Sequence, residues 1–222
     1  MNIANNIIKR SLQNVYFFVG TACGGKTTMC KALAEKYGFI HFSDNWNEPN
    51  WKEWESIIEE KYQPYSFNER KLKDWEAYFS RSVEEFLADK KRSQAAIMEN
   101  IEFSIIELIK LSQNQKVLAD IWIEDYAFLL EISERSRIAC LLAPGDLIIR
   151  DYYQREDHID FTNCIKSLKD PEKKFETQNE LFRIGAVNEA KNAEKYNLFT
   201  IMRSEKSTVA NTMQLLEAHF NL

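Results

Sequence analysis

The sequence has 222 residues, of which 45% are hydrophobic and 13% aromatic, so it can bury one substantial core and we expect a single domain over residues 1–222. Its formal net charge of -5 excludes an overall basic surface, and we expect neither nucleic acid nor an anionic membrane as a partner. No run approaches the roughly 20 apolar residues that span a bilayer, and we expect a cytoplasmic protein.

The first predicted strand leads directly into a glycine-rich turn. Residues 15–19 (VYFFV) form a continuous β-branched and aromatic run, which is typical of a parallel strand covered by helices on both faces. After the turn, Met29, Leu33 and Tyr37 are spaced four apart and share one helical face. The stretch GTACGGKTT at 20–28 is therefore predicted to join a strand to a helix.

The residues of this turn fit the pattern GxxxxGK[ST]. Four residues separate Gly20 from Gly25, and Lys26 and Thr27 follow directly. The backbone N–H groups of such a loop can surround a phosphate, the lysine can reach the β and γ phosphates, and the threonine hydroxyl can hold Mg²⁺. The sequence therefore predicts a P-loop for a nucleoside triphosphate. Its expected binding residues are Gly20, Thr21, Ala22, Cys23, Gly24, Gly25, Lys26, Thr27 and Thr28.

Further apolar runs, separated by helical patterns, predict the rest of a parallel sheet. These strands are expected at 39–44 (FIHFSD), 116–123 (KVLADIWI), 137–143 (RIACLLA) and 198–203 (LFTIMR). Residues 146–195 are predicted to be nearly continuous helix, in which Asp170 and Pro171 start a new segment. The predicted fold class is α/β, a three-layer P-loop fold with five parallel strands and helices on both faces.

The four cysteines do not have metal-binding spacing. No CxxC or Cys/His pattern links Cys23, Cys30, Cys140 and Cys164. We expect reduced thiols, mostly buried.

Companion motifs narrow the class of P-loop protein. The NKxD and DxxG strings of GTPases are both missing from the sequence. The stretch LSQNQ at 111–115 lacks the glycines of the transporter ATPase signature and abuts the third strand. A ring ATPase would need a second helical domain, for which 222 residues leave no clear room.

The chain resembles the P-loop kinases of small metabolites and nucleoside monophosphates, a group that includes adenylate, shikimate and gluconate kinases. GTACGGKTT carries the resemblance, with weaker support from HFSD, LADIW, IIRDYYQRED and MRSEKSTVANTM. The resemblance implies a sheet ordered 2-3-1-4-5, a helical acceptor-binding insertion at about 45–115, and a lid-like segment at about 145–185. It also implies a base-binding loop after the fifth strand, with ATP and Mg²⁺ as cofactors.

The resemblance also implies roles for individual residues. Asp44 matches a position that faces the acceptor, and an N-cap is its alternative role. Asp120 matches a carboxylate near Mg²⁺. Arg150 and Arg155 match the arginines of a lid that closes on the transferring phosphate, and surface ion pairs are their alternative. On one helix their five-residue spacing would point the two side chains about 140° apart, so that only one could reach the phosphate.

These observations predict an ATP-dependent phosphotransferase for a small acceptor, either a nucleoside monophosphate or a hydroxylated metabolite. Trp46, in a predicted loop between two asparagines, is a candidate acceptor contact. We expect a monomer or a homodimer. The alternative is a regulatory protein whose P-loop senses ATP without acting on a small substrate.

Overall fold

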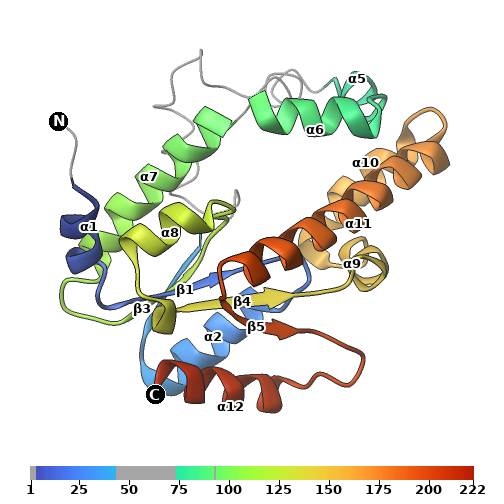
Figure 1. Cartoon of the computed structure of the whole chain (residues 1–222). Helices are drawn as coiled ribbons and strands as arrows, with labels where there is room; N and C mark the ends of the chain where they lie inside the picture. Colours follow the sequence, from blue (N-terminus) through green and yellow to red (C-terminus); the bar gives the residue numbers. More distant parts are fainter. Residues whose placement is uncertain (1–3, 44–73, 93) are drawn as a thin grey trace.

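The structure is a computed structural model that describes residues 4–43, 74–92 and 94–222. Its centre is a parallel sheet with the strand order β2-β3-β1-β4-β5 (Figure 1), which confirms the predicted fold class. The strands are β1 Val15–Val19, β2 Ile40–Ser43, β3 Val117–Asp120, β4 Ile138–Leu142 and β5 Phe199–Met202.

Helices cover both faces of the sheet (Figure 1). They are α1 Asn5–Ser11, α2 Lys26–Tyr37, α5 Trp75–Phe79, α6 Val83–Arg92, α7 Gln94–Leu111, α8 Tyr126–Ile132, α9 Gly145–Tyr152, α10 Ile159–Ser167, α11 Pro171–Lys195 and α12 Val209–Phe220. Two single-turn 3-10 helices, η2 Arg135–Arg137 and η3 Glu156–His158, join other elements. The helices α2 and α12 lie on one face, and α1, α7, α8 and α11 lie on the other.

Alternate side chains of β1 point to opposite faces of the sheet and so belong to two different parts of the core. Val15, Phe17 and Val19 pack toward α7 and α8, whereas Tyr16 and Phe18 pack toward α2 and α12. All five side chains are buried, which explains why the strand is a continuous apolar run.

The third strand is shorter than predicted. Pairing ends at Asp120, opposite Ser43 of β2 and Phe18 of β1. Ile121 and Ile123 are buried all the same, because they pack into the core beneath α8. These residues are apolar because they are buried after the strand has ended. An apolar run in the sequence does not distinguish such buried residues from residues that pair in a sheet.

The predicted nearly continuous helix over residues 146–195 is mostly helical, but it has one break that the sequence did not indicate. The chain leaves helical geometry after Tyr152, and Arg155 is extended, with φ -70° and ψ 138°. Contacts within the turn stabilise this break: the Tyr152 ring stacks on His158, with centroids 4.1 Å apart, and the Thr162 hydroxyl donates to the Tyr153 carbonyl (3.2 Å). The second predicted break is confirmed, because α11 begins at Pro171.

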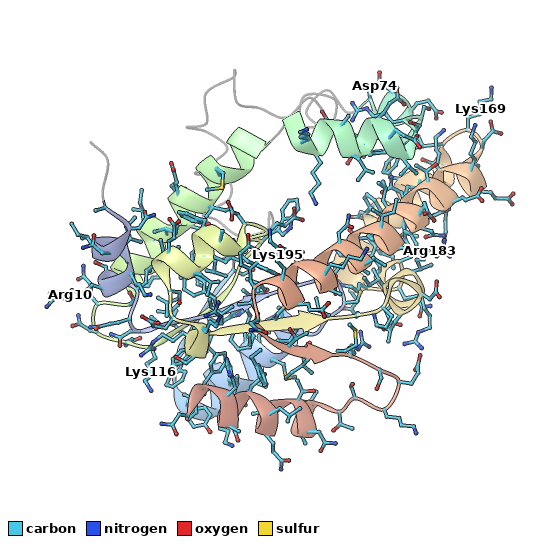
Figure 2. The ribbon with its side chains drawn as sticks, viewed as in Figure 1. Arg10, Asp74, Lys116, Lys169, Arg183 and Lys195 are labelled. Atoms are coloured by element: carbon cyan, nitrogen blue, oxygen red, sulfur yellow. The ribbon has the colours of Figure 1, made fainter. Side chains whose placement is uncertain are left out.

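The start of α11 meets the helical insertion far from the sheet. Figure 2 shows Lys169 and Asp74 at the same end of the molecule. The Glu76 carboxylate of α5 accepts from the backbone N–H of Lys169 (3.1 Å) and from Lys174 Nζ (2.7 Å). Lys174 is buried, so its ion pair with Glu76 links α11 to α5 away from water.

Candidate functional site

The turn after β1 is pressed against the backbone of β4. A Cβ atom on Gly20 or on Gly24 would lie 2.2 Å from the Leu141 carbonyl oxygen, so no side chain fits at either position. Gly25 has nothing within 4 Å of its ideal Cβ, but its φ of +98° disfavours other residues. Gly20 and Gly24 thus permit the close approach to β4, and Gly20, with a φ of +115°, shares with Gly25 a backbone conformation that disfavours other residues.

Thr21 fastens this loop to the end of β4. Its backbone N–H donates to the Leu141 carbonyl (3.1 Å), and its hydroxyl accepts from the Ala143 N–H (2.7 Å). Its exposed fraction is only 8%. The second position of the loop is therefore an anchor, and the loop opens at Ala22 and beyond.

The amino end of α2 faces the loop. No described side chain caps the first turn of this helix, so its backbone N–H groups and positive dipole end are available to an anion. Lys26 Nζ donates to the carbonyls of Gly20 (3.1 Å) and Thr21 (2.7 Å). These contacts hold its ammonium group over the loop, where a bound phosphate would compete for it.

Thr27 and Asp120 meet beside the loop. The Thr27 hydroxyl donates to Asp120 Oδ2 at 2.5 Å, and Asp120 is 7% exposed at the end of β3. Burial by itself raises the pKa of the Asp120 carboxyl, but His41, Lys26 and Thr27 together hold the pKa below its ordinary value. His41 Nε2 is 3.9 Å from Oδ2, too far for a hydrogen bond. An ionised carboxylate next to a hydroxyl is an oxygen pair that suits Mg²⁺.

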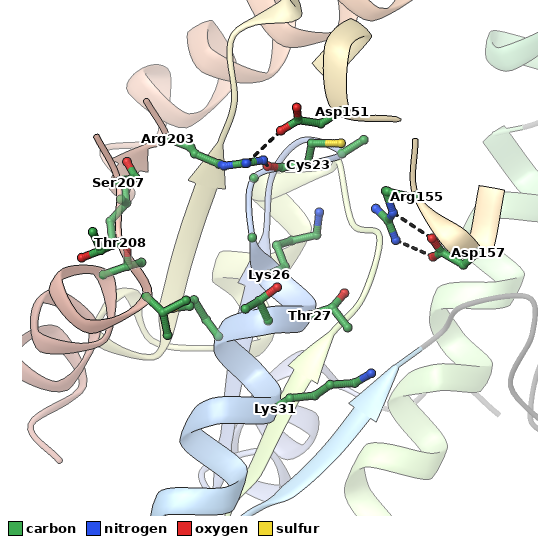
Figure 3. Close-up of a pocket in the computed structure, with 18 of the residues that line it drawn as sticks. Cys23, Lys26, Thr27, Lys31, Asp151, Arg155, Asp157, Arg203, Ser207 and Thr208 are labelled. Carbon is green, nitrogen blue, oxygen red and sulfur yellow. Dashed lines mark hydrogen bonds and ion pairs between the residues drawn. The ribbon is translucent and has the colours of Figure 1, made fainter. Parts of the chain in front are cut away.

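A cavity of about 800 Å³ opens over the loop, Lys26 and Thr27, whereas Asp120 is not one of its lining residues (Figure 3). Its walls come from the P-loop and α2, from the segment after α9, and from β5 with the start of α12. The lining residues are Ala22–Met29, Lys31, Asp151, Arg155, Glu156, Asp157, Ile201, Arg203, Ser207, Thr208, Val209 and Thr212.

The two predicted lid arginines lie in different places. Arg155 lines the cavity and forms two hydrogen bonds with Asp157, at 2.9 and 2.5 Å. Arg150 does not line it: Nε donates to Asp151 (2.6 Å) and Nη1 to Glu205. The 140° argument fails because α9 ends at Tyr152, so the two arginines do not share a helix.

Arg203 is a cavity residue that the sequence analysis did not single out. It directly follows β5, and its backbone N–H donates to the Leu142 carbonyl (2.8 Å). Its side chain reaches the P-loop, where Nη1 donates to the Cys23 carbonyl (2.7 Å), and α9, where Nη2 donates to Asp151 Oδ2 (2.8 Å). A cation directly after the last predicted strand, at the carboxyl edge of the parallel sheet, was the signal that could have revealed it.

The start of α12 lies where the resemblance implied a base-binding loop. Ser207, Thr208, Val209 and Thr212 all line the cavity. The Thr208 hydroxyl accepts from the backbone N–H of Asn211 (3.2 Å) and so caps α12. Hydroxyl groups and one apolar side chain face the cavity here, in contrast to the charged wall at Arg155.

Cys23 is the one cysteine that lines the cavity among the described residues. Burial raises the pKa of its thiol, and the nearby Arg155 opposes that shift only in part. All four cysteines are free, with Cys30 and Cys140 buried and Cys23 and Cys164 partly exposed. The group at the loop is therefore a thiol rather than a thiolate.

Some predicted residues lie outside the described part of the chain. Asp44 and Trp46 belong to residues 44–73, so their predicted acceptor contacts stay predictions. Within residues 4–43, 74–92 and 94–222, no group of three or more His, Cys, Asp or Glu side chains could hold a metal ion. In that same part, no helix combines the length and apolarity that crossing a membrane requires.

Neither a family model nor a curated protein matches the sequence of this chain. Among solved structures, the chain is similar to shikimate kinase from Acinetobacter baumannii in complex with shikimate. The match covers 96% of this chain and 97% of that chain, with a TM-score of 0.46 and 16% sequence identity. A similarity of this strength leaves the activity and the acceptor to be inferred from the site itself.

Proposed function

We propose that this protein is a phosphotransferase that moves the γ-phosphate of ATP to a small acceptor. The observation that carries the proposal is that Lys26, Thr27 and the uncapped start of α2 line a cavity of about 800 Å³. Buried Asp120 lies directly behind Thr27 and accepts its hydroxyl hydrogen bond. That volume lies within the range of small-molecule sites.

The phosphates have binding groups along the loop and α2. A triphosphate would accept hydrogen bonds from the backbone N–H groups at the start of α2. Lys26 Nζ, which now donates to two loop carbonyls, would turn to the β and γ phosphates. The Ser207–Thr212 side of the cavity would then face the rest of the nucleotide.

The Thr27–Asp120 pair would hold Mg²⁺ through oxygen atoms. The fit rests on the depressed pKa of the Asp120 carboxyl and on its 2.5 Å hydrogen bond with Thr27, since a ligand for this ion must be a deprotonated or neutral oxygen. Bound Mg²⁺ supplies charge neutralisation on the phosphates.

Arg155 would stabilise the charge that develops during transfer. The transition state of phosphoryl transfer is loose, with charge on the equatorial oxygens, so catalysis depends on positioning and electrostatics. Arg155 already lines the cavity, with Asp157 orienting its guanidinium. Asp44 stays our candidate for orienting the acceptor.

An acceptor screen tests this proposal. ADP release is measured with ATP and Mg²⁺ against nucleosides, nucleoside monophosphates, sugars and hydroxy acids. We expect at least one compound to stimulate release and Lys26→Ala to abolish that stimulation, because backbone amides cannot replace its charge. Lys36→Ala is the matched control, since Lys36 lies on the same helix but pairs with Glu217.

The result that would contradict the kinase is tight ATP binding without stimulation by any compound. Together with an associated protein partner, that result would favour the alternative of an ATP-binding regulator. Normal stimulated turnover in Lys26→Ala would overturn the assignment of the P-loop.

A further inference from the structure

The P-loop contains an unusual residue for its backbone conformation. Cys23 has a φ of +56°, in the left-handed region that disfavours side chains with a Cβ atom. The other described non-glycine residues with positive φ are Asp170, Asn197 and Asn221, which belong to the two types that adopt this region most readily. A cysteine in this conformation requires support from its surroundings.

The conformation of Cys23 closes a turn at the start of the loop. The Gly24 N–H donates to the Thr21 carbonyl at 3.3 Å, which places Cys23 at the third of four turn positions. A positive φ there is the mark of turns that prefer glycine or asparagine. The amides of Gly25 and Lys26 follow directly, so their direction depends on how this turn is held.

Arg203 holds the turn from outside. Its Nη1 donates to the Cys23 carbonyl at 2.7 Å, while its Nη2 donates to Asp151 at 2.8 Å. A hydrogen bond from a charged donor is stronger than one between neutral groups. Figure 3 shows the guanidinium of Arg203 between the loop and Asp151.

The guanidinium is itself fixed by α9. Asp151 accepts from Arg150 through Oδ1 (2.6 Å) and from Arg203 through Oδ2 (2.8 Å). Because Arg150 also donates to Glu205, a chain of ion pairs runs from α9 to the segment after β5. The side chains of Ala22 and Cys23 pack against a small apolar cluster that includes Leu147 of α9.

We propose that Arg203 is a positioning residue of the phosphate site: it stabilises the left-handed conformation of Cys23 and thereby presents the P-loop amides to the nucleotide. This inference rests on the proposed nucleotide site. Arg203 then acts on the backbone of the loop and does not contact the substrate.

The test is a rescue experiment on ATP affinity. Arg203→Ala is expected to weaken Mg·ATP binding by roughly tenfold, the scale of one charge-assisted hydrogen bond. Adding Cys23→Gly to that variant should restore most of the affinity, because glycine adopts a positive φ without the Cβ penalty. Adding Cys23→Ala should restore nothing, since alanine removes the thiol but keeps the Cβ atom.

Two further variants make the result specific. Arg183→Ala removes an arginine that also pairs with an α9 carboxylate, Asp146 (3.2 Å), but lies outside the cavity lining, and we expect its ATP affinity to be unchanged. Asp151→Asn loosens the guanidinium while keeping Arg203, so a loss of a few-fold, again rescued by Cys23→Gly, is expected. If Arg203→Ala does not fold, Asp151→Asn takes its place as the main variant of the test.

The affinities are measured by titration calorimetry, and the thermal midpoint of each variant is measured without ligand. Unchanged affinity in both Arg203→Ala and Asp151→Asn overturns the inference. A loss that Cys23→Gly does not relieve also overturns it, because Arg203 would then contact the nucleotide directly or support only the fold. Absence of ATP binding by the unmodified protein overturns the proposed function instead, and the inference with it.

Discussion

Two of the cavity walls, the P-loop wall and the wall after α9, are held in different ways. The P-loop wall depends on main-chain contacts with buried β4, through the close approach of Gly20 and Gly24 to Leu141. The wall formed by Asp151, Arg155, Glu156 and Asp157 depends on ion pairs and ring contacts whose members are partly exposed, such as Arg155 with Asp157. Main-chain packing in a core tolerates little displacement, whereas exposed ion pairs are weak. We therefore call the P-loop wall the rigid wall and the wall after α9 the adjustable wall.

Substitution of a P-loop glycine should have the largest effect on the rigid wall. Gly24→Ala forces a Cβ atom to 2.2 Å from the Leu141 carbonyl oxygen, so either the loop or β4 must shift. We expect it to cost about 3 kcal/mol or more of stability and to abolish ATP binding. The measurement is urea unfolding together with ATP titration.

Gly25→Ala is the matched variant. It meets nothing within 4 Å and carries only the cost of its positive φ, about 1–2 kcal/mol. Equal destabilisation by the two substitutions would show that the close approach to β4 is not what constrains the loop.

On the adjustable wall, we expect a large kinetic effect with little effect on stability. Arg155→Ala should lower stimulated ADP release by about 100-fold, because a cavity arginine is removed from the developing charge. ATP affinity should change only a few-fold. Arg150→Ala, outside the cavity lining, should remain within a few-fold of the unmodified protein. Comparable losses in both variants would contradict the separate roles of these arginines.

The adjustable wall should also loosen in acid. Burial, with a smaller effect from Arg155, lowers the pKa of His158 below its ordinary value of 6.5, and Asp157 opposes the shift. Below about pH 6.5 the unfolded segment therefore binds a proton that the folded segment does not. Its stability is complete above that pH and falls as the pH decreases through the folded-state pKa.

Hydrogen exchange over residues 153–162 measures this loss of stability locally. A local measurement is needed because burial also lowers the pKa of His219, which would contribute to the pH dependence of the whole protein. In His158→Gln the acid-dependent part of the exchange should disappear. Persistence of the same pH dependence in that variant would assign it to other groups.

The smallest expected effect is a gain in stability. Gly185 lies in the interior of α11 with nothing within 4 Å of its ideal Cβ, so Gly185→Ala should stabilise the protein by about 0.5–1 kcal/mol. Gly145→Ala is the contrasting variant, because its Cβ would lie 2.8 Å from Arg183 Cα. Thermal unfolding should show a gain of stability for Gly185→Ala and a loss for Gly145→Ala. A loss of stability in Gly185→Ala would contradict this account of α11.

The sequence was informative wherever the constraint was local. The P-loop is encoded by the order of its own residues, from Gly20 to Thr27, and the strand order followed from the family resemblance. The end of β3 was not predicted, because burial beyond the strand resembles strand pairing. The break after Tyr152 was not predicted, because it depends on side-chain contacts within the turn, such as Tyr152 with His158, that the helical pattern does not reveal. Arg203 was overlooked for a related reason. Its partners Cys23 and Asp151 are 180 and 52 residues away, and only the fold brings them together.

One long helix links the outermost part of the molecule to the sheet. α11 has 25 residues, which corresponds to a rod of about 37 Å. Its carboxyl end is held close to β5, while Lys174, near its amino end, is fastened to Glu76 of α5. As a lever pivoting near Tyr196, this rod would convert a tilt of about 10° into a displacement of about 6 Å at Pro171. Any such tilt beside the sheet would therefore move the helical insertion farther than the sheet itself, and α5 would move with α11 because Glu76 is paired with Lys174.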